Sequence, residues 1–148
     1  MIRLLALLVS GVLTASLAWA ESFDPSSAYR AVLDAVVHER HHAVVGLAET
    51  FLATHPQIDH APQVRLWLSM SLGHLRRRAE ALKALDRLKH QLDRDDPLWP
   101  DVLFWEGELS RKIAQRLRAK LVWTQLLEQF PESAWVPQTH MGLGLVYL

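Results

Sequence analysis

The sequence contains no cysteine, and this absence excludes several kinds of protein. A disulfide framework cannot form, and thiol redox chemistry is excluded as well. An exported lipoprotein is excluded too, because its lipid is attached to a cysteine at the cleavage site. The sequence also lacks asparagine, so it contains no N-glycosylation acceptor.

Charge of one sign is not in excess, because 16 lysine and arginine residues balance 16 aspartate and glutamate residues. Proteins that bind nucleic acid or an anionic membrane surface usually carry clusters of basic residues. We therefore expect no nucleic acid among the partners of this chain. Strand patterns are missing as well: the β-branched pairs at 36–37 and 44–45 lie within longer stretches of helical spacing, and length favours a helix there.

The start of the chain, positions 1–20, has the features of a secretory signal peptide. A short positive start ending at Arg3 is followed by an apolar run and by Ala18-Trp19-Ala20, which fits an A-x-A cleavage pattern. The apolar run is shorter than the roughly 18–20 residues that a membrane span needs. The sequence thus predicts cleavage after Ala20 and export of residues 21–148 as one domain, without a transmembrane segment after cleavage.

Small residues recur at a fixed spacing in the exported part of the chain. They form three pairs of equal spacing, and the step from one pair to the next is constant: Ala31 and Ala43, Ser69 and Ala81, and Gly107 and Ala119. Pro62, Pro100 and Pro137 keep nearly the same step, each seven residues before a small residue. Self-similarity over such a long period is typical of a helical repeat array.

The apolar residues between these markers have helical spacing, so we expect an all-α fold. Three helical hairpins are predicted over residues 25–56, 62–97 and 100–131, followed by a partial unit at 137–148 that consists of a seventh helix. In each hairpin the small residue should face the alanine of its own pair. The next layer should be filled by the larger residue four positions after that alanine, namely Leu47, Leu85 or Trp123.

This register resembles the tetratricopeptide repeat, whose pattern combines W-x2-L-G-x2-Y with later alanine and proline positions. The matching residues are Leu143, Gly144 and Tyr147 in the last unit, and Gly107, Ala119, Trp123 and Pro131 in the third. The first motif position holds residues other than tryptophan, and the period exceeds the family's usual length of about 34 residues. The resemblance implies a right-handed α-solenoid of three hairpins plus a terminal seventh helix.

Two details resemble tetratricopeptide proteins of the bacterial cell envelope in particular. Phe130-Pro131-Glu132-Ser133 is similar to their inter-repeat segments, and Trp67 and Trp105 stand two residues before the small residue. The similar proteins are the periplasmic coordinator of the Tol–Pal system and the lipoprotein of the outer-membrane barrel-assembly machine. Together with a signal peptide and the lack of cysteine, this resemblance implies a location in the periplasm.

The resemblance also implies a function, because the first helix of each hairpin lines a concave groove in this family. We expect a non-catalytic scaffold, without a cofactor, that binds a peptide segment or partner helix of a protein involved in envelope assembly or maintenance. Trp67 and Trp105 are the expected anchors, since aromatic side chains are favoured at interface cores. The groove residues are predicted to be Tyr29, Leu66, Trp67, Met70, His74, Phe104, Trp105, Glu108, Arg111, Lys112 and Met141.

Two alternatives remain open. Residues 38–42 spell H-E-x-x-H, a motif in which one helix presents two imidazoles to zinc, so the first alternative is a zinc protein or metallopeptidase using His38 and His42. Against it, the repeat register places these residues at a hairpin turn. The other alternative is the N-terminal module of a larger envelope protein, or self-association through the C-terminal helix, because terminal repeats normally have a polar outer face and residues 144–148 are apolar.

Overall fold

The structure of the protein, a computed structural model, describes residues 25–148, and the predicted signal peptide lies outside these residues. The described residues form seven helices and no strand, which confirms the predicted all-α class. The helices are α2 (Pro25–Val37), α3 (His41–Thr54), α4 (Ala61–His74), α5 (Arg78–Lys89), α6 (Trp99–Lys112), α7 (Arg116–Gln129) and α8 (Val136–Tyr147). No helix in this part of the chain has the length and apolarity needed to cross a membrane.

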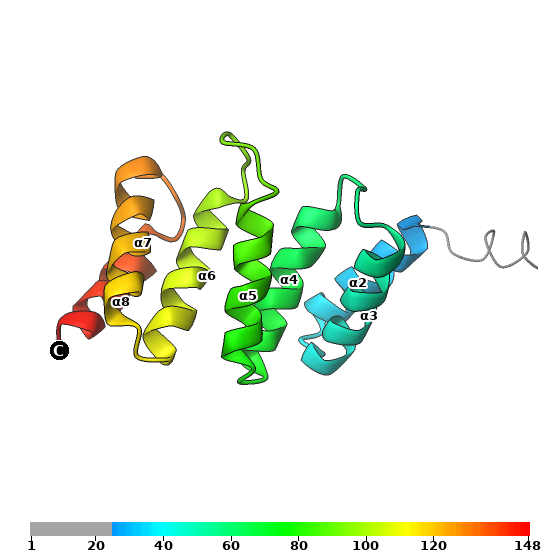
Figure 1. Ribbon diagram of the computed structural model, residues 1–148, viewed down its shortest axis with the longest axis horizontal. Coiled ribbons are helices and arrows are strands. Elements are labelled where there is room, and N and C mark those ends of the chain that lie inside the picture. The colour runs from blue at the N-terminus through cyan, green and yellow to red at the C-terminus, as the bar shows by residue number, and fades with distance from the viewer. Residues whose placement is uncertain (1–24) are drawn as a thin grey trace, which may run out of the picture.

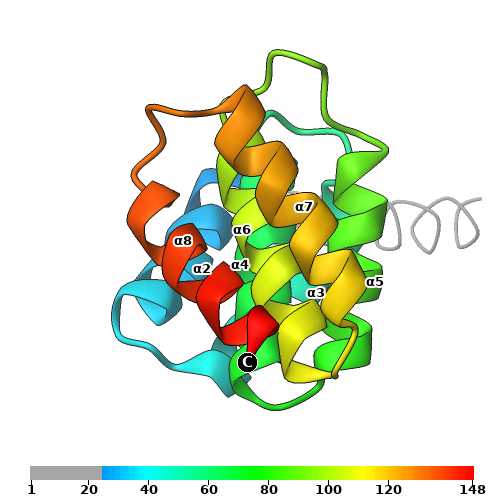
Figure 2. The ribbon, with the colours of Figure 1, turned by 90° about the vertical axis from the view of Figure 1, so that its left-hand side faces the viewer.

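The helices lie in a row, in which each one packs against the next in sequence (Figure 1). Viewed along the row, they form two layers (Figure 2). The A layer consists of α2, α4, α6 and α8, and successive helices of this layer also contact one another. The B layer consists of α3, α5 and α7, and no such contact joins its helices within the described residues. The A layer is therefore the more closely spaced of the two.

The ends of the helices follow from local sequence. Pro62, Pro100 and Pro137 lie in the first turns of α4, α6 and α8, where a residue without an N–H group leaves no helical hydrogen bond unmade. The turn between the two helices of each hairpin contains one residue with positive φ: Glu39 at 53°, Arg76 at 64° and Ala114 at 63°. Such backbone geometry is uncommon outside glycine, so its recurrence at one place in every hairpin identifies the structural register.

The turn residues show that the constant step predicted between hairpins is wrong for the first hairpin. The interval from Glu39 to Arg76 is one residue shorter than the interval from Arg76 to Ala114. The structural equivalents of Ser69, Ala81 and Leu85 are consequently Val32, Val44 and Ala48, which are all fully buried in one core cluster. The predicted residues Ala31 and Leu47 are exposed, and Ala43 is half-buried. The prediction was wrong here because two alanines happen to lie one residue away from the true contact.

In the other two hairpins the residues predicted to fill the contact are buried, as expected. Ser69, Ala81 and Leu85 are fully buried, and Ser69 Oγ donates a hydrogen bond of 2.8 Å to the carbonyl oxygen of Ala81. In the third hairpin Ala119 and Trp123 are fully buried, and Trp123 Nε1 donates to the carbonyl oxygen of Phe104 at 3.1 Å. The two helices of each hairpin thus approach where the sequence places its short side chains.

Where the two helices of a hairpin meet, a smaller side chain in the A layer is matched by a larger side chain in the B layer. From the first hairpin to the third, the A-layer residue shrinks from Val32 to Ser69 to Gly107, while its B-layer neighbour grows from alanine to leucine to tryptophan. The tryptophan, Trp123, also lies against Gly142 of α8. A constant packing density in the core requires such an exchange, since added volume on one side must be removed on the other.

Candidate functional site: an aromatic row on the A layer

All of the predicted groove residues lie on A-layer helices, and several of them form one row of side chains. The first group in this row is centred on Tyr29 of α2, whose ring stacks on His60 and Trp67 with centroid separations of 4.4 and 5.6 Å. Tyr29 and Trp67 are both half-buried. Each ring therefore has one part packed against the protein and another part accessible to a ligand.

The second group is a pair of imidazoles. The rings of His41 and His74 stack with a centroid separation of 4.3 Å and an interplanar angle of 3°, and His74 also lies 5.9 Å from the ring of Trp105. Burial, together with the nearby His41 and Lys112, lowers the pKa of His74 below its ordinary value. The neutral form of His74 is thus favoured, and its ring continues the row toward Trp105.

The third group lies at the junction of α6 and α8. Phe104 stacks on Trp135 at 4.0 Å, and Trp105 meets the same indole edge-on at 6.3 Å. Trp135 Nε1 donates to Asp101 Oδ1 at 2.9 Å, which fixes the orientation of the indole. The Nε1 atom of Trp105 is buried and has no hydrogen-bond acceptor within the described residues.

A small cavity separates the first group from the second. Its volume is about 140 Å³, and it is lined by Val36, Glu39, His41, Trp67, Met70, Ser71 and His74. The lining combines an aromatic ring and a thioether with several hydrogen-bonding groups. Apolar walls with a few polar groups are typical of binding pockets in general. The predicted residues Trp67, Met70 and His74 are thus brought together at one cavity.

Charged residues follow the row at the C-terminal end of α6. Arg111 Nη2 donates to Glu108 Oε1 at 2.8 Å, and Lys112 Nζ lies 3.2 Å from the same oxygen. Burial by itself would raise the pKa of Glu108, but the hydrogen bonds and charges of Arg111 and Lys112 outweigh it, and the pKa lies below its usual value. With one carboxylate and two cations, this group carries a net positive charge.

Two predicted groove residues are buried. Leu66 and Phe104 are 3% and 9% exposed, so both are core residues whose side chains support the row from beneath. Met141 of α8 is 68% exposed. Helical spacing predicts which face of a helix a residue belongs to, but it does not predict how deeply that residue is buried. Leu66 and Phe104 belong to the buried part of the face.

Sequence reasoning missed His41, His60 and Trp135 as members of the row. His41 begins α3 and His60 precedes α4, so both lie at helix ends, where periodicity gives no information about direction. Trp135 immediately precedes α8 and closely follows the Phe130-Pro131-Glu132-Ser133 segment. The sequence did contain a signal for Trp135. This tryptophan lies between the inter-repeat segment and Pro137, and Pro137 marks the start of an A-layer helix.

The H-E-x-x-H segment does not form the helix that a zinc site of this kind requires. Helix α2 ends at Val37 and α3 begins at His41, with Glu39 in the left-handed region between them. His38 is exposed and contacts Asp34, with 3.2 Å between Nδ1 and the nearest carboxylate oxygen, while His42 is exposed on α3. The two imidazoles therefore do not share one helical face.

No protein-family model matches the chain, and no curated protein matches it significantly.

Proposed function

We propose that the chain is exported to the periplasm and is a helical-repeat scaffold of the tetratricopeptide type that binds a peptide segment or a partner helix of a cell-envelope protein. The repeat assignment is supported by the recurring hairpins, by their positive-φ turns and by the exchange of residue size between layers. The right-handed solenoid is proposed from the resemblance to the tetratricopeptide repeat. Closer spacing of the A-layer helices supports the A layer as its concave side, because a row of helices bends toward its shorter side.

The observation that carries this proposal is the continuous row of partly accessible aromatic rings on the A layer. Tyr29, Trp67, His74, Trp105 and Trp135 lie in this row across α2, α4, α6 and the start of α8, and ring contacts join its members on neighbouring helices. Tryptophan, tyrosine and arginine are the residues most often responsible for binding energy at protein interfaces. A row of this kind would be unusual on a surface that contacts only water, and it favours a binding role over catalysis.

The charged residues beside the row would set the orientation of a bound segment. Glu108 is held by Arg111 and Lys112, so the surplus positive charge favours an acidic residue of the partner there. The cavity lined by Trp67, Met70 and His74 would take an apolar or aromatic side chain, and Lys112 lies near enough to lower the pKa of His74. The proposed ligand is thus an extended or helical segment with an aromatic or aliphatic anchor followed by an acidic residue.

The experiment is capture of partners from a cell-envelope extract by the purified full chain. We compare the wild type with a variant carrying both Trp67→Ala and Trp105→Ala. The variant should lose captured partners by about tenfold or more, as expected when interface anchors are removed. The control is Trp99→Ala, since Trp99 is another half-buried tryptophan of α6 and its indole N–H is already bonded to the carbonyl oxygen of Asp93. Unchanged capture by a folded double variant would contradict the proposal.

A second candidate function is that of a repeat module within a larger envelope protein. It is favoured by α8, which includes no aspartate, glutamate, lysine or arginine and leaves several large apolar side chains exposed. The exposed side chains at this end are Met141, Leu145, Tyr147 and Leu148. Self-association through α8 is the related proposal, and sedimentation of the wild type and of a Leu145→Glu variant tests it. A concentration-dependent dimer that the variant abolishes would support association, while a monomer at all concentrations would contradict it.

A further inference from the structure

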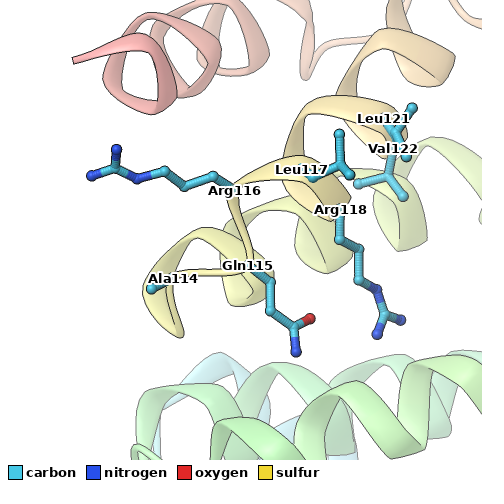
Figure 3. A pocket seen from close by; sticks show the side chains of 7 residues that line it. All are labelled: Ala114, Gln115, Arg116, Leu117, Arg118, Leu121 and Val122. Atoms are coloured by element: carbon cyan, nitrogen blue, oxygen red, sulfur yellow. The ribbon is translucent and has the colours of Figure 1, made fainter.

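A second groove lies on the B layer, away from the aromatic row. Its volume is about 630 Å³, and it is lined by residues 114–118, 121 and 122 at the start of α7. Figure 3 shows Leu117, Leu121 and Val122 together on this helix, while Gln115 and Arg118 extend toward the neighbouring helices. Leu117 and Leu121 are 71% and 61% exposed, so two large apolar side chains lie open at the groove.

The other hairpins show that the fold does not need leucine at these two positions. Counted from the positive-φ turn residue, the equivalents of Leu117 and Leu121 are Ala79 and Lys83 in α5. In α3 they are His42 and Gly46. All four equivalents are exposed, although α5 follows α3 and α7 follows α5 in the row. A further hairpin placed in the same way would therefore leave Leu117 and Leu121 uncovered.

The charges around the groove are basic. Arg116, Arg118 and Lys120 lie in the first two turns of α7, and the first turn contains no acidic residue. In α5 the equivalent of Arg118 is Glu80, an acidic residue in the first turn. Cations at a helix N-terminus oppose the helix dipole, so these residues do not serve the stability of the helix itself.

Within the described residues, only one of these cations is neutralised by carboxylates of the protein. Arg118 donates to Glu106 Oε1 at 2.9 Å and to Asp86 Oδ1 at 2.7 Å. Lys120 lies 5.0 Å above the ring of Tyr147, and no ion pair to Arg116 or Lys120 is found within residues 25–148. The exposed leucines are thus bordered by positive charge that a partner can neutralise.

We propose that this groove binds an acidic amphipathic helix of a partner protein. Leu117 and Leu121 contact the apolar stripe of the helix above the buried Val122, and Arg116 pairs with a glutamate or aspartate residue beside the stripe. The helix-in-groove mode fits an apolar cleft with charged borders, and charge complementarity sets the orientation of the partner. This site is separate from the aromatic row, so it does not depend on the function proposed for that row.

The probe is a synthetic amphipathic peptide with a leucine stripe flanked by glutamates, labelled for fluorescence anisotropy. Its counterpart has lysine in place of every glutamate. With the full chain, the acidic peptide should bind at least about tenfold more tightly than the lysine peptide, and added salt should weaken its binding. Equal binding of both peptides, or no binding of the acidic peptide, would overturn the proposal.

The matched variant carries Leu117→Ala and Leu121→Gln, which removes both leucines without changing the charge of α7. Because both positions are exposed, the variant is expected to fold, and circular dichroism checks this. Binding of the acidic peptide should fall by about tenfold or more, whereas Leu33→Ala on α2 should leave it unchanged. Undiminished binding by the folded double variant would overturn the assignment.

Two further measurements distinguish the acidic helix from other occupants of the groove, namely a second copy of this chain and an anionic lipid surface. A wild-type dimer that dissociates in the double variant would overturn the proposal in favour of a second copy of this chain. Binding to phosphatidylglycerol vesicles that the double variant loses, without binding of the acidic peptide, would overturn it in favour of an anionic lipid surface. A monomer that binds the peptide and not the vesicles supports the proposal.

Discussion

Gly107 of α6 lies so close to Trp123 of α7 that a β-carbon at position 107 would be 2.2 Å from Trp123 Nε1. A β-carbon at Gly142 of α8 would similarly be 2.4 Å from Cη2 of the same indole. Three helices thus meet at one tryptophan because two of them have no side chain there. This contact joins the third hairpin to α8. It thereby fixes the position of Trp135, the last residue of the aromatic row, which immediately precedes α8.

Gly107→Ala should therefore destabilise the protein. The added methyl group overpacks a rigid, fully buried indole, and such overpacking costs about 1–3 kcal/mol or more. The free energy of unfolding by urea measures the effect. Gly144→Ala is the matched control, since a β-carbon there meets no other described residue within 4 Å. It should be neutral or stabilise the helix by up to about 1 kcal/mol. Equal effects of the two substitutions would contradict the account.

Glu106→Gln should also lower the free energy of unfolding, because Glu106 is a buried carboxylate between two cations. It is 2% exposed, and it accepts hydrogen bonds from Lys89 Nζ at 2.7 Å and from Arg118 Nε at 2.9 Å. Loss of the charge leaves both cations partly buried without their main partner, at a cost of about 1–3 kcal/mol.

The control for this prediction is Glu80→Gln. Glu80 pairs with Arg77 at 2.7 Å, but this pair is exposed, and exposed ion pairs contribute little to stability. The same urea titration should show no measurable change for this variant. If Glu106→Gln were as harmless as Glu80→Gln, the network that links α5, α6 and α7 would have no structural role.

The stability of the protein should decrease as the pH falls below about 6.5, in part because of His74. Burial first, then His41 and Lys112, lower the pKa of His74, while Glu39 acts in the opposite direction. The unfolded chain takes up a proton near pH 6.5, whereas folded His74 does so only at lower pH. This contribution is complete above the unfolded pKa and decreases as the pH falls toward the folded pKa.

Two measurements check this prediction. The NMR titration of the His74 ring should have its midpoint below the ordinary value of 6.5. The loss of unfolding free energy between about pH 7.5 and 5 should be smaller in His74→Gln than in the wild type. A midpoint at or above the ordinary value, with the same pH dependence in both proteins, would contradict the environment described for the stacked imidazoles.

The sequence was sufficient to predict the all-α class, the positions of the helices to within a few residues, and the burial of Ser69, Ala81 and Ala119 where the helices of a hairpin meet. These features depend on helical period and on the size of single residues, both of which can be read along a chain. The first hairpin was misaligned because Ala31 is small enough to lie on the surface as well as in a contact. Size alone does not distinguish these two environments.

The site was predicted less completely for a different reason. Trp67, Met70 and His74 were expected together from their spacing on one helix, and they do line one cavity. His41 and Trp135 join the row across turns, and the exposed leucines of α7 are recognised only by comparison with equivalent positions in α3 and α5. Contacts between helix ends depend on turn geometry, which helical periodicity does not contain.

The most direct test of the central claim is site-specific photo-crosslinking in the native cell envelope. A photoreactive amino acid is placed singly at Met70 or Glu108 on the A layer, and at Lys83 or Gln125 on the B layer as matched positions. The account predicts that both A-layer positions crosslink to the same partner protein, and that the Trp67→Ala and Trp105→Ala variant loses this product. Absence of any product from the A layer, while a B-layer position crosslinks a partner, would contradict it.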